Sequence, residues 1–598
     1  GPIVIHPKKE SIRYDKDVVV LLSDWADESG EDIIKNLRKD GDYYLYKKGT
    51  MRSWLGAIQA KKLGSFLKNE WTRMGGMDFS DVGYDAFLMN GKKDFQLLNA
   101  HRGEKIRIRI INAAASSYFY VSLGQSPMKV ISSDGQDIEP ADAKELFIGM
   151  AETYDVLFEL PENRNYELKA TSQDGLGFAS GWIGMGEKIS APSRPFPDMY
   201  MAMNHSAHKE HRADSDSSKL NNVEHTDHLA HRPSSAPQTQ HGCKAEEYWD
   251  EPMEMCMPSN DLNQVNTENI IEILTVDNIK AKESTAFLEN AKNYDLKLVL
   301  GGDMRRYIWF INGKAAFEDR ILRINEGDII RFTFENTTMM HHPMHLHGHF
   351  FRVVNKNGDR SPLKHTVDVP PHATRTIEFL ANEPGYWMLH CHNLFHMNSG
   401  MARVVEYSNF KPSPEIEHLQ HRHHHLHDPW YFYGNTEVAT NHAQANLRFS
   451  QTWNEIEARF ETRNTSGKNL SYNEPWEVES DLLYHRWFNQ YFHLIGGGLL
   501  FDRKISAAIG ASYILPMLIK SRVLVDHRGK FRFDVEKRFQ WSKNIFTDVD
   551  LTWRPNQADM ISHDFEFEVS LMYGSSWSWA VGLMLTDRNI GAGIQVKF

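Results

Sequence analysis

Residues 389–401 read Leu-His-Cys-His-Asn-Leu-Phe-His-Met-Asn-Ser-Gly-Met and concentrate side chains that can bind a metal. The pattern predicts a strand that runs into a turn, and alternate side chains of a strand face opposite sides. His390 and His392 therefore point one way, and Cys391 points the other way. One face offers two imidazoles to a metal, while the opposite face offers a thiolate to a second metal a few covalent bonds away.

A copper centre can be assembled around Cys391 from residues on both sides of it. His396 and Met401 follow at successive intervals of five residues, and residues 341–349 read His-His-Pro-Met-His-Leu-His-Gly-His upstream. His342 lies just before a proline, which favours an extended conformation. A cysteine, two histidines and a weak thioether form the ligand set of a blue-copper electron-transfer centre.

His345 and His347 are spaced for one face of a strand, so the upstream segment offers two further imidazoles. A histidine-rich surface loop with an unrelated core cysteine is the alternative explanation, but it does not account for the joint spacing. The two segments resemble the carboxy-terminal copper signatures of the multicopper oxidases, H-P-x-H-x-H and H-C-H-x-x-x-H-x-x-x-x-M/L, in the same order. Over residues 1–408 the chain is similar to the copper-resistance CopA type of this family.

The resemblance implies one complete copper site and part of a second. It assigns the type 1 copper to His342, Cys391, His396 and Met401, the type 2 copper to His345, and the binuclear type 3 pair to His347, His390 and His392. Electrons would pass from Cys391 to its two flanking histidines, and dioxygen would be reduced to water. The family's trinuclear cluster uses eight imidazoles, and this chain supplies four of them.

Composition narrows the class of protein. The 598 residues suffice for about three or four domains. A net charge of −12, from 67 basic and 79 acidic residues, argues against nucleic-acid binding. No apolar run is long enough for a transmembrane helix, and no signal peptide is visible. With Cys391 assigned to copper, Cys243 and Cys256 remain to form a disulfide or to bind metal.

The start of the chain resembles the end of a domain. Residues 1–8 are similar to the last strand of the family's first cupredoxin domain, which carries the other two His-x-His motifs. Residues 1–200 contain no such pair. We therefore expect residues 1–8 to be a remnant of that domain and the trinuclear site of this chain to be incomplete.

Two segments read as copies of one β domain. Residues 307–314 echo residues 84–92, and residues 326–336 echo residues 102–112 at a similar spacing. This pattern indicates a repeated β-sandwich. We predict a cupredoxin-like domain without copper at 9–190 and a copper-binding one at 263–410. Within the first copy, strands are expected at 18–22, 87–92, 105–111 and 154–160, and partly helical segments at 31–48 and 51–70.

The segments after each copy are rich in soft or imidazole ligands. Residues 191–262 lack periodicity and carry methionines at alternate positions with histidines between them, at Met199, Met201, Met203, Met253, Met255 and Met257 and at His205, His208, His211, His225, His228, His231 and His241. Thioethers suit Cu(I) and imidazoles suit Cu(II), so we interpret this segment as a copper-capturing linker, with an inert linker as the alternative. Residues 411–430 form a second linker that contains the histidine run 418–427.

Residues 431–598 show a different pattern. Apolar and polar side chains alternate in short segments separated by turns, as in 531–541, 565–573 and 577–585, and the chain ends on Phe598. This is typical of an outer-membrane β-barrel, here of roughly eight to ten strands. A lipocalin-like soluble barrel with its apolar face inward is the alternative. In pattern and context the region resembles the copper-resistance CopB-type outer-membrane proteins.

The predicted fold class is all-β, with two cupredoxin-like Greek-key β-sandwich domains followed by a C-terminal antiparallel β-barrel of the outer-membrane type. We predict a periplasmic copper oxidase, anchored to the outer membrane, that takes electrons from Cu(I), reduces dioxygen and serves copper tolerance. An even number of strands would place both barrel ends on the periplasmic side. Alternatives are a phenol-oxidising laccase, a non-enzymatic copper store, and a copper exporter that uses the polar lumen lined by Arg532, Asp534, Glu566 and Glu568.

Overall fold

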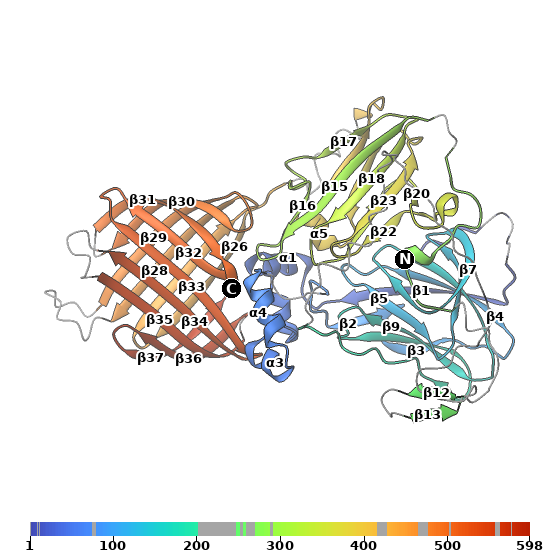
Figure 1. Cartoon of the computed structure of the whole chain (residues 1–598), viewed down its shortest axis with the longest axis horizontal. Coiled ribbons are helices and arrows are strands. Elements are labelled where there is room, and N and C mark those ends of the chain that lie inside the picture. The colour runs from blue at the N-terminus through green and yellow to red at the C-terminus, as the bar shows by residue number, and fades with distance from the viewer. Residues whose placement is uncertain are drawn as a thin grey trace, which may run out of the picture. The chain divides into compact units, whose positions relative to one another are not determined.

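The computed structural model describes residues 2–6, 8, 10, 12–73, 79–200, 247–250, 255–258, 270–287, 291–414, 427–464, 476–501, 504–555, 563–575 and 577–598. The fold is all-β, with short helices, two sandwich-like domains and a closed barrel (Figure 1). Residues 204–270 form a separate unit, in which Glu247–Asp250 (β12) and Met255–Pro258 (β13) pair antiparallel. Of the first linker, Met201, Met203, Met253, all seven histidines and Cys243 lie outside the described residues, as does most of the second histidine run. Residues 2–6 form no strand, and Ile3 and Ile5 are both 87% exposed.

The first β domain is one sheet with strand order β2-β1-β4-β8-β6-β7-β5-β9-β10-β3, to which β11 and β14 add at β9 and β7. Its strands are Lys16–Trp25 (β1), Ala86–Met89 (β2), Asp94–Leu98 (β3), Lys105–Asn112 (β4), Phe119–Leu123 (β5), Met128–Ser133 (β6), Gln136–Ile148 (β7), Thr153–Glu159 (β8), Asn165–Ser172 (β9), Phe178–Gly184 (β10), Lys188–Ile189 (β11) and Ile271–Leu274 (β14). The predicted strands at 18–22, 87–92, 105–111 and 154–160 are present.

Strand β4 shows why the alternation of its sequence matters. Ile106, Ile108 and Ile110 are fully buried in the core of the domain. On the other face, Arg107 and Arg109 are only 8% exposed, because each forms close ion pairs: Arg107 with Asp155 at 2.6 Å and Arg109 with Asp17 at 2.8 Å. The charged face of β4 is therefore a covered ion-pair network and not a solvent-facing surface.

The helical segments predicted between the first two strands are present as Gly30–Lys39 (α1), Tyr43–Lys48 (α2), Trp54–Gln59 (α3) and Leu63–Trp71 (α4). Helix α1 begins after Ser29, whose hydroxyl accepts a hydrogen bond from the Asp32 amide at 3.1 Å. Its apolar stripe, Ile33, Ile34 and Leu37, is buried in the core of the second β domain. Helix α1 therefore packs in the core of the second β domain, although its sequence lies within the first copy.

The second β domain has two sheets, with strand orders β16-β15-β18-β23-β20-β21 and β17-β25-β24-β19-β22. Its elements are Asn293–Asp303 (β15), Ile308–Ile311 (β16), Ile321–Ile324 (β17), Ile329–Asn336 (β18), His342–Leu346 (β19), Phe351–Val353 (β20), Leu363–Lys364 (β21), Thr366–Val369 (β22), Thr374–Leu380 (β23), Tyr386–Cys391 (β24), Leu394–Asn398 (α5) and Ala402–Tyr407 (β25).

The repeat found in the sequence extends to the pairing of the strands. Strand β1 pairs antiparallel with β2 and parallel with β4, just as β15 pairs antiparallel with β16 and parallel with β18. In each copy the second strand of the antiparallel pair, β2 or β16, is followed by an Asn-Gly turn in the left-handed region, at Asn90-Gly91 and Asn312-Gly313. The Asn90 carboxamide accepts from the Leu21 amide at 2.8 Å, and Asn312 accepts from the Val299 amide at 2.7 Å. The two copies thus share the same local hydrogen bonds.

The C-terminal region is a closed antiparallel barrel of 12 strands, β26 to β37 (Figure 1). The strands are Tyr431–Ala439 (β26), His442–Ser450 (β27), Asn454–Asn464 (β28), Trp476–Trp487 (β29), Phe492–Phe501 (β30), Lys504–Leu515 (β31), Ile519–Asp526 (β32), Phe531–Ser542 (β33), Ile545–Pro555 (β34), His563–Gly574 (β35), Trp579–Thr586 (β36) and Ile590–Lys597 (β37). The predicted count of eight to ten is wrong. Strands such as β30 and β31 carry glycine and alanine where the count relied on large apolar residues, so their alternation is weak in the sequence.

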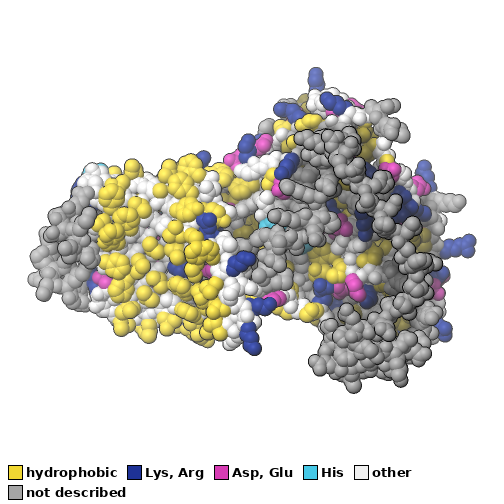
Figure 2. Space-filling view, in the orientation of Figure 1, with side chains coloured by type: hydrophobic (Ala, Val, Ile, Leu, Met, Phe, Trp, Pro, Cys, Tyr) yellow, Lys and Arg dark blue, Asp and Glu magenta, His cyan; other side chains and the backbone are white. Residues whose placement is uncertain are grey.

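The barrel is apolar outside and polar inside. Leu571, Leu583 and Trp579 are 51%, 57% and 54% exposed, and Figure 2 shows a broad hydrophobic surface over the barrel strands. Arg532 and Glu566 are buried in the interior. A soluble barrel with an apolar interior does not match this distribution. Among the described residues, no helix is long and apolar enough to cross a membrane.

Candidate metal centre

Strands β19 and β24 are adjacent and antiparallel, and their register builds both candidate sites at once. Met344 lies opposite Cys391, and His345 lies opposite His390. Because side chains alternate along a strand, Cys391 faces the core of the domain while His390 faces the other side of the sheet. The sequence-based expectation that the cysteine and its flanking histidines serve opposite faces agrees with this geometry.

On the core side, three ligand atoms converge. His342 Nδ1 and His396 Nδ1 lie 3.1 Å apart, and Cys391 Sγ lies 3.7 Å and 3.6 Å from them. Ligand atoms held about 2.0–2.3 Å from one ion lie roughly 3–4 Å from each other, so the three atoms fit a single metal. All three residues are fully buried.

The other ring nitrogen of each histidine is held by a protein group. His342 Nε2 lies 2.8 Å from the Thr338 hydroxyl, and His396 Nε2 lies 3.1 Å from Asp81 Oδ2. Such contacts fix the orientation of a ligating imidazole and leave Nδ1 for the metal. Neither Thr338 nor Asp81 was singled out in the sequence, because nothing in their local pattern marks them; Asp81 precedes β2 and reaches the site only through the fold.

His396 is placed by the helix that follows β24. The Asn393 side chain caps α5 by accepting hydrogen bonds from the Phe395 and His396 amides, at 3.1 Å and 3.4 Å. The Cys391 amide donates to the Met401 carbonyl at 3.1 Å, which returns the chain to the site. Met401 is fully buried; its assignment as the axial ligand stays a prediction.

On the other face of the sheet, histidines gather into a second cluster. Ligand nitrogens of His345, His347 and His390 all lie within 4.8 Å of one another. His347 Nε2 is 3.2 Å from His390 Nε2, and the ring of His392 is 5.5 Å from that of His345. The structure thus brings together all four histidines that the resemblance assigned to the trinuclear site.

Hydrogen bonds within this cluster fix the tautomer of two rings. His345 Nδ1 donates to the His365 carbonyl at 2.7 Å, and His390 Nδ1 donates to the Cys391 carbonyl at 2.9 Å. The remaining Nε2 atoms carry lone pairs. His392 Nδ1 is buried and has no hydrogen-bond partner in the described part of the chain, which is costly unless an ion or another group satisfies it. The donor set therefore fits copper, which imidazole suits.

Burial sets the protonation of both clusters. It lowers the pKa of His345 to about 2 and of His392 to about 4, and it holds the pKa of His342 well below its ordinary value. These imidazoles are neutral at physiological pH, as metal ligation requires. Burial also raises the pKa of the Cys391 thiol well above its ordinary value, so a bound cation is needed to hold it as thiolate.

Buried charged and polar side chains also meet at the junction of the two β domains, near these sites. Lys364 is fully buried and lies 3.2 Å from Asp134 and 3.3 Å from Glu152, on the first domain. Tyr118 donates to Asp368 at 2.7 Å, and His341 contacts the same carboxylate at 2.9 Å. Sequence reasoning missed this junction because its members are far apart along the chain.

Comparison with known proteins agrees with the geometry. Residues 16–182 and 290–411 each match a family model described as multicopper oxidase. The chain is 32% identical over 452 residues to copper resistance protein A of Escherichia coli, covering 68% of this chain and 74% of that protein. The chain belongs to the multicopper oxidase family, whose members bind type 1, type 2 and type 3 copper.

Within this family, the chain is similar to copper resistance proteins in particular. A copper resistance protein A homologue of Pseudomonas syringae pv. tomato is 33% identical over 437 residues, 68% of this chain and 73% of that protein. Among solved structures, the crystal structure of Fet3p, a multicopper oxidase that functions in iron import, aligns over 70% of this chain and 72% of that one at 14% identity, with a TM-score of 0.43. Both family-model matches end before the barrel begins.

Proposed function

We propose that this chain is the copper-binding and membrane-anchoring part of an oxidase that transfers single electrons from Cu(I) to dioxygen and so serves copper tolerance. Four Cu(I) ions, one dioxygen molecule and four protons would give four Cu(II) ions and two water molecules. The single observation that carries the proposal is the back-to-back arrangement of the two clusters, joined through the covalent bonds of Cys391 and its flanking histidines.

Each group of this chain has a defined part in the proposal. His342, Cys391, His396 and Met401 would hold the type 1 copper, and His345, His347, His390 and His392 would hold part of the type 2 and type 3 coppers. Bound copper would supply the one-electron chemistry. The chain's own contribution is to keep the imidazoles neutral and oriented, to exclude water from Cys391 and to connect the two clusters through two peptide units.

The four histidines of the second cluster are half of the family's set of eight imidazoles. We propose that a first cupredoxin domain supplies the other four, and that the 598-residue chain alone holds fewer than four coppers. Elemental analysis of the purified chain beside a variant in which His345, His347, His390 and His392 are replaced by Ala tests this, because a difference of three coppers per chain would show a complete trinuclear cluster and contradict the proposal.

The relatives' role in copper resistance and the methionines along the chain support Cu(I) as the electron donor. Of the three methionines beside the copper motif, two pack in the core and only one is partly exposed. Met340 and Met344 are buried in the hydrophobic core of the second domain, where they pack, and only Met339 is partly exposed. A phenol-oxidising laccase is the competing activity. Comparing rates with Cu(I) and with a bulky phenol, on enzyme that contains the complete cluster, distinguishes the two.

A visible absorption spectrum of the copper-loaded, oxidised chain is the first test. An intense blue band that disappears in Cys391→Ser is expected from a thiolate–copper centre, even when the second cluster is incomplete. If a well-folded sample lacks the band, a non-enzymatic copper store becomes the better description. Oxygen uptake gives a second distinction, because an oxidase with a complete cluster consumes dioxygen in proportion to the donor and a store does not.

We further propose that the barrel inserts into the outer membrane and holds the cupredoxin domains in the periplasm, as in a CopB-like protein. The apolar outer surface supports this, as does a closed barrel with an even number of strands. The end that carries both barrel termini has the short connections 451–453, 488–491 and 516–518, whereas the longer segments 465–475 and 556–562 join strands at the other end. Short turns face the periplasm in bacterial barrels.

An anchor is favoured over an open copper exporter by the filling of the lumen. Arg532 contacts Asp481 at 2.9 Å across the interior, and Arg463 contacts Glu566 at 2.7 Å, so charged side chains tie opposite walls together. The histidine run 418–427 lies between the domains and the barrel in sequence, and we propose that it passes copper between them. Deleting 418–427 should lower copper tolerance of cells without changing turnover by the purified enzyme; unchanged tolerance would exclude the relay.

A further inference from the structure

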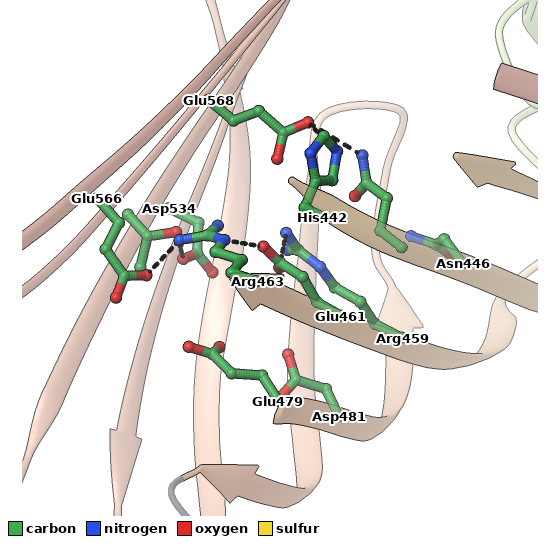
Figure 3. A network of polar contacts seen from close by, with 12 residues as sticks. His442, Asn446, Arg459, Glu461, Arg463, Glu479, Asp481, Asp534, Glu566 and Glu568 are labelled. Atoms are coloured by element: carbon green, nitrogen blue, oxygen red, sulfur yellow. Dashed lines mark hydrogen bonds and ion pairs between the residues drawn. The ribbon is translucent and has the colours of Figure 1, made fainter. Parts of the chain in front are cut away.

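One side-chain cluster inside the barrel is not used by the proposed oxidase. Glu437 on β26, His442 on β27 and Glu568 on β35 are between 0% and 4% exposed. His442 Nε2 lies 2.9 Å from Glu437 Oε1 and 3.2 Å from Glu568 Oε1. Figure 3 shows His442 beside Glu568, apart from the arginine-rich part of the network.

The charge around this cluster is unbalanced. No arginine or lysine among the described residues lies within 4.0 Å of either Glu437 or Glu568, so a single imidazole faces two buried carboxylates. Asp550, directly opposite Glu568 in the strand register, has no ion-pair partner within that distance in the described barrel either. Burying carboxylates without compensating charge is costly, and a divalent cation with a neutral imidazole would balance Glu437 and Glu568.

A neighbouring cluster provides the contrast. Glu477, Glu479 and Glu566 also bring their oxygens together, but arginines neutralise them. Arg588 contacts Glu477 at 2.5 Å, and Arg554 contacts both Glu479 and Glu566 at 2.7 Å. The barrel therefore compensates its other carboxylate cluster with guanidinium groups and leaves the Glu437–His442–Glu568 cluster without one.

Surrounding groups orient the three side chains toward one point. His442 Nδ1 is 3.1 Å from Asn441 Oδ1, whose own amide donates to the Met584 carbonyl at 3.3 Å, so Nδ1 carries a proton and Nε2 is the ring nitrogen that faces both carboxylates. Gln595 donates to the second oxygen of Glu437 at 3.0 Å. Gly591 makes room for this arrangement, because a Cβ there would lie 1.9 Å from Asn441 Oδ1.

The spacing and the surroundings suit a metal ion. Ligand atoms bound about 2.0–2.2 Å from one ion lie roughly 2.9–3.5 Å apart at bond angles near 90–110°, which matches the two distances from His442 Nε2. Glu437, Glu568 and Asp550 also line a cavity of about 500 Å³ between the barrel interior and helices α1 to α4.

We propose that Glu437, His442 and Glu568 form a binding site for a divalent transition-metal ion within the barrel. One imidazole and two carboxylates give a nitrogen–oxygen ligand set, for which Cu(II) ranks above Zn(II) in affinity. The site is separate from the cupredoxin clusters, so the proposal does not depend on the proposed oxidase activity.

The experiment measures barrel unfolding, because metal bound at the two cupredoxin clusters or the histidine-rich segments does not bridge barrel strands. The full chain in detergent is treated with EDTA and then with Cu(II) or Zn(II), and the temperature at which the barrel unfolds is read from its heat-dependent mobility on SDS gels. We expect either ion to raise this temperature by several degrees in the wild type. The double variant Glu437→Gln/Glu568→Gln should lose the shift, yet unfold without metal no earlier than the wild type, since it removes uncompensated charge.

Two further variants complete the design. His442→Gln should bind the metal at least tenfold more weakly. It should also lack one Cu(II) electron paramagnetic resonance signal that the wild type shows, the signal with coupling to a single imidazole nitrogen. Glu479→Gln, in the arginine-filled cluster, should keep the metal-dependent shift. The proposal is overturned if the wild-type barrel shows no shift at saturating Cu(II) and Zn(II), or if the double variant retains it; either result would make the cluster a purely structural ion pair.

Discussion

Asp81 offers a direct test of how the protein tunes the candidate type 1 centre. Burial raises the pKa of this carboxyl, but the electrostatic interaction with His396 and hydrogen bonds from His396, Asn393 and Tyr307 outweigh burial and hold its pKa below the ordinary value. Asp81 is therefore an anion within the core, 3.1 Å from His396 Nε2. Asp81→Asn removes this charge while nearly preserving the shape of the side chain.

The size of the effect follows from distance. A metal on His396 Nδ1 would lie roughly 7 Å from the carboxylate, given a metal–nitrogen bond of about 2.0 Å. At an effective dielectric constant of about 20, a unit charge at roughly 7 Å contributes about 2.4 kcal/mol, equivalent to about 100 mV for one electron. Because the anion stabilises the more highly charged oxidised copper, its removal should raise the reduction potential by that order.

The assay is a redox titration of the blue absorption band in the copper-loaded chain. Asp81→Asn should keep the band and its copper, and its midpoint potential should rise by about 100 mV. Asp142→Asn is the matched control, because it removes an equal charge from an exposed ion pair with Lys129 and should leave the potential unchanged. A potential that moves by less than about 20 mV, or that falls, would refute the electrostatic reasoning.

Three further predictions concern stability. Lys364→Met leaves Asp134 and Glu152 buried without their cation, so it should destabilise the amino-terminal domains by about 3–5 kcal/mol in chemical unfolding. Adding Asp134→Asn should recover part of this loss. An unchanged unfolding free energy in Lys364→Met would contradict a stabilising role of the three buried groups. Burial raises the pKa of Glu152 to about 7 from 4.5, so its stabilising contribution is present below pH 4.5 and is lost as pH rises through 7. The thermal unfolding temperature should fall as pH rises across this window, and it should fall less in Glu152→Gln. An unfolding temperature that rises with pH would contradict the assigned role of Glu152. Leu583→Arg on the outer face of the barrel should cost about 2–4 kcal/mol in lipid vesicles and Leu583→Ala much less; similar costs would argue against lipid contact.

The sequence was most informative where chemistry fixes the spacing of residues. The His390-Cys391-His392 triplet needs only strand alternation to serve two faces, so its local sequence predicts the geometry before any tertiary contact is known. The Asn-Gly turns at Asn90 and Asn312 likewise report the domain repeat, because the left-handed backbone they require is locally encoded. The all-β fold with a C-terminal barrel was predictable for the same reason.

Other features depend on residues that meet only in the folded chain. The number of barrel strands was underestimated because closure depends on hydrogen bonding between neighbours, which glycine-rich strands such as β30 make without a strong side-chain pattern. The burial of the charged face of β4 also depends on the fold, since Asp17 and Asp155 cover its arginines from adjacent strands. Strand pairing is long-range information that a local pattern does not contain.

By itself, then, the sequence determined the class of the protein and the identity of its candidate copper ligands, since ligand type and strand period are properties of short segments. Only the tertiary structure decided what surrounds those ligands. Asp81 reaches His396 from another domain, and Glu568 reaches His442 from a strand that is distant in sequence. Charge compensation in a buried site is a sum over neighbours in space, and the fold alone chooses those neighbours.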